Sequence, residues 1–160
     1  MISLVMDTSN SYLAVGLFKD NMCLEAFQEK GSRRQSEKAI PSLKEVLDRH
    51  HIALKDVNEM IITSGPGSYT GVRVAMTIAK TLAAVSDVRI KSVSSLAAYA
   101  GMNQALSVID ARGHKVFVGV YENGLPLIKE QVMTLEDFTQ LRAEYEDFEL
   151  VGEVGCLGLD

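Results

Sequence analysis

The chain has 160 residues, of which 47% are hydrophobic and 23% charged, the balance of an ordinary globular protein with one or two domains. Its formal net charge of −5 argues against a protein that binds nucleic acid by itself. Phosphate binding needs a basic patch, and the one basic cluster, Arg33-Arg34, is too small to provide it. No apolar run is long enough to cross a bilayer and no leader-type segment opens the sequence, so we expect a cytoplasmic protein without membrane contact.

Alternating and helical apolar patterns predict a mixed order of strands and helices. Period-two alternation predicts strands at 3–6, 13–17 and 22–28, with a turn at 19–21. A stripe formed by Ile40, Leu43 and Leu47 predicts a helix over 36–50. We then expect a strand at 60–64, a loop over 65–71, a helix over 72–86, a strand at 89–93 and a short helix to residue 100 that Ser94 caps.

The pattern then restarts. Val5-Met6-Asp7, a turn and the alternating stretch 13–18 align without a gap with Val108-Ile109-Asp110, a turn and the stretch 116–121. In this alignment Asp7 falls on Asp110, Gly16 on Gly119, and the turn Asp20-Asn21 on Asn123-Gly124. We therefore predict two copies of one unit, an N-terminal unit over 1–103 and a partial second unit over 104–160.

A duplicated strand, hairpin and crossover unit is typical of an α/β fold in which two units face each other across a cleft. Each unit is expected to present its strand-end aspartate to that cleft, where open α/β sheets bind ligands. In a nucleotide-binding interpretation Asp7 holds a metal-bound water and the turn at Thr8 and Ser9 cradles a phosphate. Asp110 and Arg112 are the candidates in the second copy. The alternative is a plain turn whose side chains bond nearby backbone, with Arg112 paired to Asp110, and both interpretations stay open.

The most distinctive stretch follows a predicted strand and opens a helix; it consists of Gly65, Pro66, Gly67, Ser68, Tyr69, Thr70 and Gly71. It is not a Walker A loop, because no Gly-Lys-Ser/Thr follows, and Thr70 stands where a dinucleotide-binding loop needs its third glycine. Nor is Ser68 in a nucleophile elbow, since Pro66 and Thr70 occupy the positions that need glycine. A structural turn and a ligand- or partner-binding loop remain alternatives.

The two longer predicted helices have apolar faces that suit a partner. In the 72–86 helix, alanines recur every fourth residue and make a flat side, next to a second apolar row. Such a helix is usually buried on more than one side, either within its own domain or partly against another protein. The candidates for a shared interface are Ile40, Leu43, Leu47, Val74, Ala75, Ile78, Ala79 and Leu82.

No catalytic or metal-binding set emerges from the sequence. His50, His51 and His114 lack the spacing of metal ligands, and Cys23 and Cys156 form no Cys-x-x-Cys pair. No local motif indicates a Ser, His and Asp set. A metalloprotease is therefore only a remote alternative, and we expect no catalytic residue and no metal site.

Several of these motifs, in order, resemble one family. Met6-Asp7-Thr8-Ser9 resembles its opening motif, the stretch 64–80 its most specific signature, and Val108-Ile109-Asp110-Ala111-Arg112 a later one. On these motifs the chain is identified as a member of the TsaB family, once labelled YeaZ and described as glycoprotease-like. The resemblance covers nearly the whole chain and is densest over 1–121.

The resemblance implies a fold of the actin, sugar-kinase and Hsp70 class (ASKHA, ribonuclease H-like). It implies a non-catalytic role in forming N6-threonylcarbamoyladenosine in tRNAs that read codons starting with A. The implied partners are a TsaD-like transferase subunit bound through the helices near 36–50 and 72–86, a TsaE-like ATPase, and a second copy in a homodimer, with tRNA reached only through the complex. No cofactor of its own is implied; ATP or ADP with Mg, at the cleft or at a partner junction, is left open.

Two departures from the family pattern bear on function. Gln35 stands where the family usually shows His, which further weakens a metal or protease interpretation. Family members also commonly run longer, so the second unit is expected to lack its later helices. The leading hypothesis is a non-catalytic complex subunit, and the second is an ATP-binding phosphotransferase or ATPase that uses Asp7 and Asp110.

Overall fold

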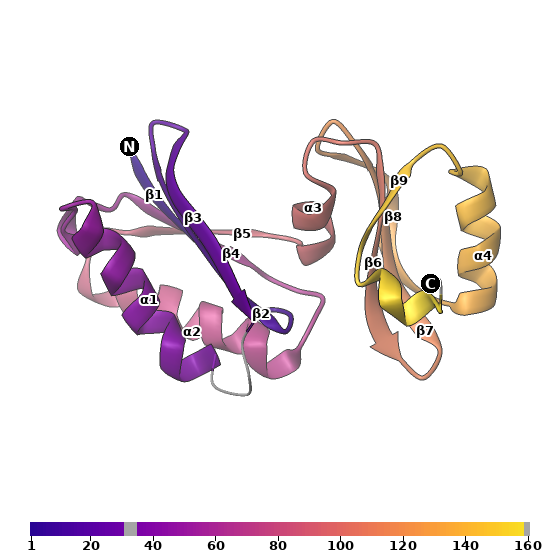
Figure 1. Cartoon of the computed structure of the whole chain (residues 1–160), viewed down its shortest axis with the longest axis horizontal. Coiled ribbons are helices and arrows are strands. Elements are labelled where there is room, and N and C mark those ends of the chain that lie inside the picture. The colour runs from indigo at the N-terminus through magenta and orange to yellow at the C-terminus, as the bar shows by residue number, and fades with distance from the viewer. Residues whose placement is uncertain (31–34, 159–160) are drawn as a thin grey trace. The chain divides into compact units, whose positions relative to one another are not determined.

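The computed structural model describes residues 1–30 and 35–158, so Arg33-Arg34 lies outside the described residues. The chain divides into two compact units, Met1–Val93 (unit 1) and Ser94–Asp160 (unit 2), whose helices and strands are labelled in Figure 1. The division falls before the predicted boundary at residue 103. The reason is that the helix following Ser94 packs its apolar side against the sheet of unit 2.

Unit 1 is a five-stranded sheet with two helices over the described residues, in the strand order β3-β2-β1-β4-β5. Strands β1, β2 and β3 are antiparallel neighbours, whereas β4 and β5 run parallel to β1. The elements are β1 (Ile2–Asp7), β2 (Tyr12–Lys19), β3 (Met22–Lys30), α1 (Gln35–Arg49), the 3-10 turn η1 (Leu54–Asp56), β4 (Glu59–Thr63), α2 (Tyr69–Val85) and β5 (Arg89–Val93).

Unit 2 repeats the first part of this order, with the described strands arranged β8-β7-β6-β9. Strand β9 runs parallel to β6, as β4 runs parallel to β1. The elements are α3 (Ser95–Ala100), β6 (Ala105–Arg112), β7 (Lys115–Glu122), β8 (Leu125–Thr134), α4 (Leu135–Glu144), β9 (Glu149–Gly152) and the 3-10 turn η2 (Val154–Leu157). Among the described residues nothing in unit 2 corresponds to α2 and β5.

The predicted duplication is confirmed at the level of topology. Each unit contains three antiparallel strands, a helix and a strand that returns parallel to the first. The matched turns also agree, because Asp20 and Asn21 in one unit and Asn123 and Gly124 in the other all have positive φ. Such two-residue turns fit the right-handed twist of a hairpin. The predicted α/β class with a repeated unit is therefore correct.

The two copies differ by one residue in how their first two strands pair. In unit 1, Gly16 of β2 lies opposite Val5 of β1. In unit 2, Gly119 of β7 lies opposite Ser107 of β6, and not opposite Val108, which the gapless alignment matches with Val5. Because side chains alternate between the faces of a strand, this slip turns matched residues of β1 and β6 to opposite faces of their sheets.

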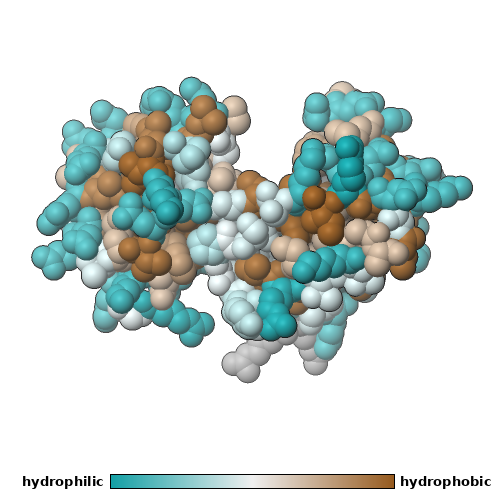
Figure 2. Space-filling model, turned by 180° about the vertical axis from the view of Figure 1, so that it is seen from behind, coloured by the Kyte–Doolittle hydropathy of each residue, from teal (hydrophilic) through white to brown (hydrophobic). Residues whose placement is uncertain are grey.

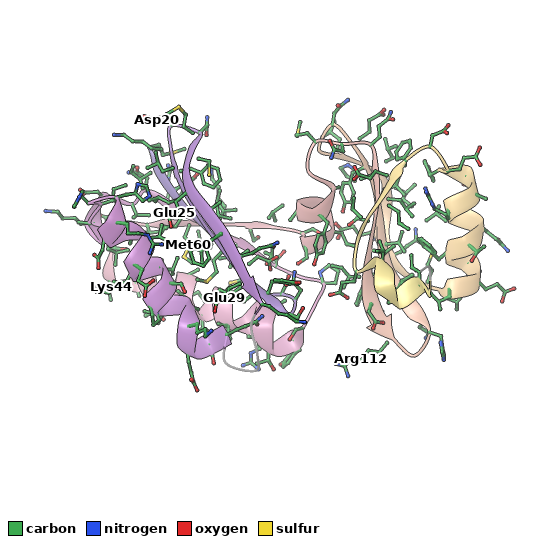
Figure 3. The ribbon with its side chains drawn as sticks, in the orientation of Figure 1. Asp20, Glu25, Glu29, Lys44, Met60 and Arg112 are labelled. Carbon is green, nitrogen blue, oxygen red and sulfur yellow. The ribbon has the colours of Figure 1, made fainter. Side chains whose placement is uncertain are left out.

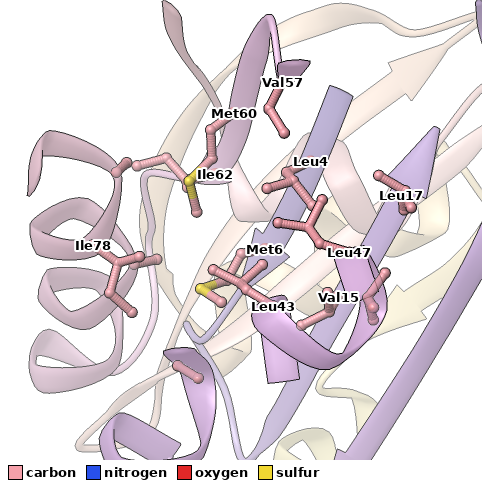
Figure 4. Packing of buried hydrophobic residues seen from close by; sticks show 14 of the residues in the cluster. Leu4, Met6, Val15, Leu17, Leu43, Leu47, Val57, Met60, Ile62 and Ile78 are labelled. Atoms are coloured by element: carbon pink, nitrogen blue, oxygen red, sulfur yellow. The ribbon is translucent and has the colours of Figure 1, made fainter. Parts of the chain in front are cut away.

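The core of unit 1 lies between its sheet and the two helices on one side of it. Alternate residues of the central strands point into this layer, and α1 and α2 contribute their apolar stripes. The largest side chains of the cluster meet there, as Figure 4 shows for Leu4, Met6, Val15, Leu17, Leu43, Leu47, Val57, Met60, Ile62 and Ile78. Burying this apolar surface is the main stabilising contribution to unit 1.

A buried carboxylate, Glu59, begins β4 on the opposite side of the sheet. Its Oε1 accepts a hydrogen bond from Ser3 Oγ at 2.8 Å, and Lys91 Nζ lies 2.7 Å from its Oε2. The hydrogen bond from Lys91, and to a smaller extent that from Ser3, lowers the pKa of Glu59 below its usual value, whereas burial opposes this shift. These three side chains therefore link β1, β4 and β5.

We expect Glu59→Gln to make the stability of the protein less dependent on pH. A carboxyl whose pKa is lowered on folding stabilises the folded state above its unfolded pKa of 4.5, and this contribution is lost as the pH falls through the folded value. Urea unfolding should show the variant less stable near neutral pH, with the difference narrowing in acid. The exposed Glu144→Gln is the control, and a difference that does not change with pH would contradict the assignment.

Candidate functional site

The turn after β1 is held by hydrogen bonds that stay within the protein. Asp7 Oδ1 accepts from the Ser9 amide at 2.8 Å, from Ser9 Oγ at 2.6 Å and from Thr63 Oγ1 at 2.6 Å. The Thr8 hydroxyl donates to the backbone carbonyl of Gly71. Thr8 and Ser9 are both buried. These bonds favour the plain-turn interpretation over a phosphate cradle, because the predicted ligand groups already have partners.

The Gly65–Gly71 stretch closes over this turn. The Ser68 amide donates to the Ser9 carbonyl at 2.7 Å. A Cβ built on Gly67 would overlap the Ser9 carbonyl oxygen, and one on Gly71 would overlap the Thr8 carbonyl oxygen. Glycine is needed at both positions because two backbone segments touch there. Of the two interpretations left open by the sequence, this geometry supports the structural turn.

The predicted end of the loop is wrong by one helical turn. Helix α2 begins at Tyr69, so Tyr69, Thr70 and Gly71 are helical. Ser68 is the N-cap residue, and its side chain accepts a hydrogen bond from the Gly71 amide. A capping serine satisfies an amide that the helix leaves unpaired, which allows the helix to start earlier than its apolar pattern indicates.

Asp110 is not the structural counterpart of Asp7, contrary to the prediction. Asp7 lies opposite Ala14 in the β1–β2 ladder, and the equivalent pair in the β6–β7 ladder is Ile109 with Phe117. Asp110 comes one residue later and so lies on the face of its sheet that α4 covers. The physical cause is the one-residue slip between the two copies, which no alignment by apolar pattern can detect.

The predicted bond between Arg112 and Asp110 forms through the main chain. The Arg112 amide donates to Asp110 Oδ1 at 2.8 Å, and the Asp110 amide donates to Glu153 Oε2 at 2.9 Å. The Arg112 side chain points away from the β6–β7 hairpin (Figure 3). Arg112 also has a positive φ of 62°, as expected in a tight hairpin turn. The hairpin, rather than a ligand, accounts for this arrangement.

Helices α1 and α2 form an apolar groove on the outside of unit 1. Two adjoining hollows of about 380 Å³ and 340 Å³ share Ile40, Thr77 and Ile78 in their walls. We call them together the inter-helix groove. Ile40 is 60% exposed in the wall that the two hollows share. The other predicted interface residues that line the groove are Leu43, Leu47, Val74 and Leu82.

Two of the predicted interface residues do not reach the surface. Ala75 and Ala79 are fully buried in the core of unit 1. Their small side chains let α2 approach its own sheet closely, which is the alternative that the sequence left open. Ala75 and Ala79 are therefore removed from the candidate interface.

A pair formed by Tyr69, which the sequence predicted in the 65–71 loop, and Arg73, which it predicted in the following helix, lies at one end of the groove. Tyr69 is 76% exposed, and the Arg73 guanidinium carbon lies 5.2 Å from the centre of its ring. Arg73 Nη1 also donates to the Tyr69 hydroxyl at 3.0 Å. The spacing of four residues would have revealed this pair if the start of the helix had been placed at Tyr69. Exposed tyrosine and arginine are common anchors of protein interfaces.

Neither a metal-binding cluster nor a membrane-spanning helix occurs among the described residues. They contain no group of three or more His, Cys, Asp or Glu side chains arranged to hold a metal ion. Within the same residues, none of the helices has the length and apolar character needed to span a membrane. Figure 2 shows apolar patches among hydrophilic side chains on both units, so exposed apolar groups alone do not mark an interface.

Known proteins provide independent evidence on the family. The family described as "TsaD: tRNA N6-adenosine threonylcarbamoyltransferase" matches residues 28–149. The Bacillus subtilis (strain 168) protein named tRNA threonylcarbamoyladenosine biosynthesis protein TsaB is 32% identical over 153 residues, which cover 90% of this chain and 67% of that protein. The chain belongs to the TsaB family.

Other members agree with this assignment. The TsaB protein of Escherichia coli (strain K12) is 31% identical over 132 residues, covering 76% of this chain and 57% of its own length. The structure described as YeaZ from Pseudomonas aeruginosa superposes with a TM-score of 0.75 at 27% identity, over 82% of this chain and 67% of that one. The chain thus spans between 57% and 67% of the length of these family members.

We expect Gly71→Ala to destabilise unit 1 by about 3 kcal/mol, because the added methyl group has to push the Thr8 backbone aside. Thermal and urea unfolding of the purified chain measure this. Gly155→Ala is the matched control, since a Cβ there meets no atom within 4 Å, and it should change stability by less than about 0.5 kcal/mol. Equal stability of the two variants would show that close backbone contact between Gly71 and Thr8 does not stabilise unit 1.

Proposed function

We propose that this chain is a non-catalytic subunit in the formation of N6-threonylcarbamoyladenosine in tRNAs that read codons starting with A. In this proposal it acts by binding a TsaD-like transferase subunit through the inter-helix groove. The observation that carries the proposal is the groove itself, an apolar hollow between α1 and α2 with Ile40 largely exposed in its wall. The family membership and the names of its relatives supply the reaction.

The chemistry of the groove suits a helical partner. Its floor is aliphatic, with Leu43, Leu47 and Ile78 buried beneath the more exposed Ile40. An apolar centre with a polar rim is the usual anatomy of a protein interface. The Tyr69–Arg73 pair stands on the rim, and Lys44 and Asp48 are paired at 2.6 Å on the outer turn of α1. A partner helix with an apolar stripe would fill the hollow between these polar groups.

The state of the strand-end acids supports a non-catalytic role. Asp7 Oδ1 is occupied by three donors from Ser9 and Thr63, and Asp110 lies on the other face of its own sheet. An actin-like phosphotransferase would need the two carboxylates at equivalent positions of the two units. The strand pairing places Asp7 and Asp110 at different positions, which does not support that alternative. The proposal includes no cofactor of the chain's own; ATP or ADP with Mg belongs to a partner or to a partner junction.

The remaining partners follow from the same proposal. A TsaE-like ATPase joins through the TsaD-like subunit. The complex binds the tRNA, because a chain with a net charge of −5 binds the tRNA phosphates poorly by itself. A second copy of the chain competes for the inter-helix groove and forms a homodimer when the transferase subunit is absent.

We expect Ile40→Asp to weaken binding of the TsaD-like subunit at least about 30-fold, because it places a charge in the apolar centre of the interface. Isothermal titration calorimetry with the partner of the same organism measures this. Ile40 is 60% exposed, so the variant should fold normally, which circular dichroism checks.

The matched control is Leu125→Asp, because Leu125 is 68% exposed but belongs to unit 2. It should bind the partner like the unchanged chain. If Ile40→Asp and Leu125→Asp bind equally well, the groove is not the interface.

We also expect the purified chain to turn over no ATP by itself, whereas the full set of modification components should lose tRNA modification when this chain is left out. Phosphate release and mass spectrometry of nucleosides are the two readouts. ATP hydrolysis at an enzyme-like rate that Asp7→Ala abolishes would favour the phosphotransferase alternative instead.

A further inference from the structure

The two helices that form the inter-helix groove differ in how their charges are compensated. Helix α2 carries Arg73 and Lys80 and no acidic residue. Within the part of the chain that the structure describes, neither of these cations forms an ion pair. On α1, by contrast, Lys44 pairs with Asp48 at 2.6 Å. Helix α2 therefore contributes positive charge that its own surroundings leave uncompensated.

The Arg73 guanidinium is held in place and keeps most of its hydrogen-bonding capacity. It lies over the Tyr69 ring and donates from Nη1 to the Tyr69 hydroxyl, at the rim of the hollow that Ile40 also lines. A guanidinium has five N–H donors in a planar fork that matches a carboxylate. Because Arg73 is exposed, its remaining donors are accessible from outside the chain. Its fixed position lowers the entropy lost when a carboxylate binds.

Both helices begin at the Arg73 end of the groove. The hollow beside Arg73 is lined by Ser36 and Ile40 from the first turns of α1, together with the first turns of α2. The adjoining hollow is lined by later residues of both helices, such as Leu47 and Leu82. The peptide dipoles of a helix give its N-terminal end a partial positive charge. The two helices therefore add to the positive field of Arg73.

The opposite end of the groove is electrically neutral by comparison. Asp48 is the acid that lines the second hollow, and Lys44 already compensates it. Among the described residues that line the hollow beside Arg73 there is no carboxylate. Glu37, the acid in the first turn of α1, lines neither hollow. A segment that enters the groove thus meets a cationic end and a neutral end.

We infer that Arg73 is the specificity-determining residue of the inter-helix groove and pairs with a carboxylate of the partner segment at the end where α1 and α2 begin. This inference rests on the proposed function, because it takes a TsaD-like subunit as the occupant of the groove. Apolar contacts are non-directional, so the aliphatic floor alone cannot distinguish the two directions of an amphipathic helix. An acid that has to reach Arg73 selects one direction and disfavours partners with a basic residue there.

The test measures how the affinity for the TsaD-like subunit depends on salt. Arg73→Glu should weaken binding about 10-fold at about 0.05 M NaCl, because it replaces an attraction by a repulsion. The difference should shrink towards about 0.5 M NaCl, where ions screen charges over a few ångströms. Arg73 is exposed, so the variant should fold like the unchanged chain, which circular dichroism checks.

The matched control is Lys129→Glu, which makes the same change in net charge. Lys129 is exposed on β8 of unit 2, away from the groove in sequence and in fold. This variant should bind the TsaD-like subunit like the unchanged chain at each salt concentration.

A charge exchange identifies the partner group. In a set of variants of the TsaD-like subunit, each exposed Asp or Glu is replaced by Arg in turn. One of them should bind Arg73→Glu at least about 10-fold more tightly than the unchanged TsaD-like subunit does, because the opposite charges face each other again. The same variant should bind the unchanged chain more weakly.

Equal binding of Arg73→Glu and Lys129→Glu, while Ile40→Asp still weakens binding, would overturn the inference and leave the proposed function standing. The lack of any restoring exchange would have the same meaning. If Arg73→Glu alters only the self-association of the chain in sedimentation experiments, the carboxylate belongs to a second copy and the inference is wrong. An Ile40→Asp variant that binds normally would instead overturn the proposed function, and the inference with it.

Discussion

The close contact between two stretches of backbone sets the geometry of unit 1. Gly67 and Gly71 let the chain at the start of α2 touch the carbonyl groups of Thr8 and Ser9, so no side chain separates the end of β1 from the start of α2. The direction in which α2 crosses the sheet is therefore set by main-chain atoms, which have little freedom to adjust. Helix α1 packs beside α2, and the inter-helix groove takes its width from this arrangement.

The sequence predicts most of the fold because local signals are consistent over long stretches. Strand alternation, the hairpin turns at Asp20-Asn21 and Asn123-Gly124 and the cap at Ser94 each act over a few residues, and all are seen in the structure. The exact pairing of β6 with β7 is different. It depends on which face each residue shows to the helices, and a shift by one residue leaves the apolar pattern of a doubly buried strand unchanged.

The candidate site could be predicted only in part for the same reason. The turn at Asp7 and the apolar stripe with Ile40 are visible in the sequence, but the burial of Ala75 and Ala79 depends on packing between distant elements. Asp110 shows the limit most clearly, because matching acids in sequence did not mean matching places in space. The proposed function rests on apolar surfaces such as the inter-helix groove, and not on a reactive group.

The outer border of unit 2 has a further consequence. Strand β9 pairs with β6 on one side, and among the described residues no strand pairs with its other side, where β4 of unit 1 has β5. An unpaired edge strand can pair with a strand of another molecule, and natural proteins limit such aggregation by keeping edge strands short and charged. With four residues, Glu149 at its start and a positive φ at Gly152, β9 meets that description and is a poor template for pairing between molecules.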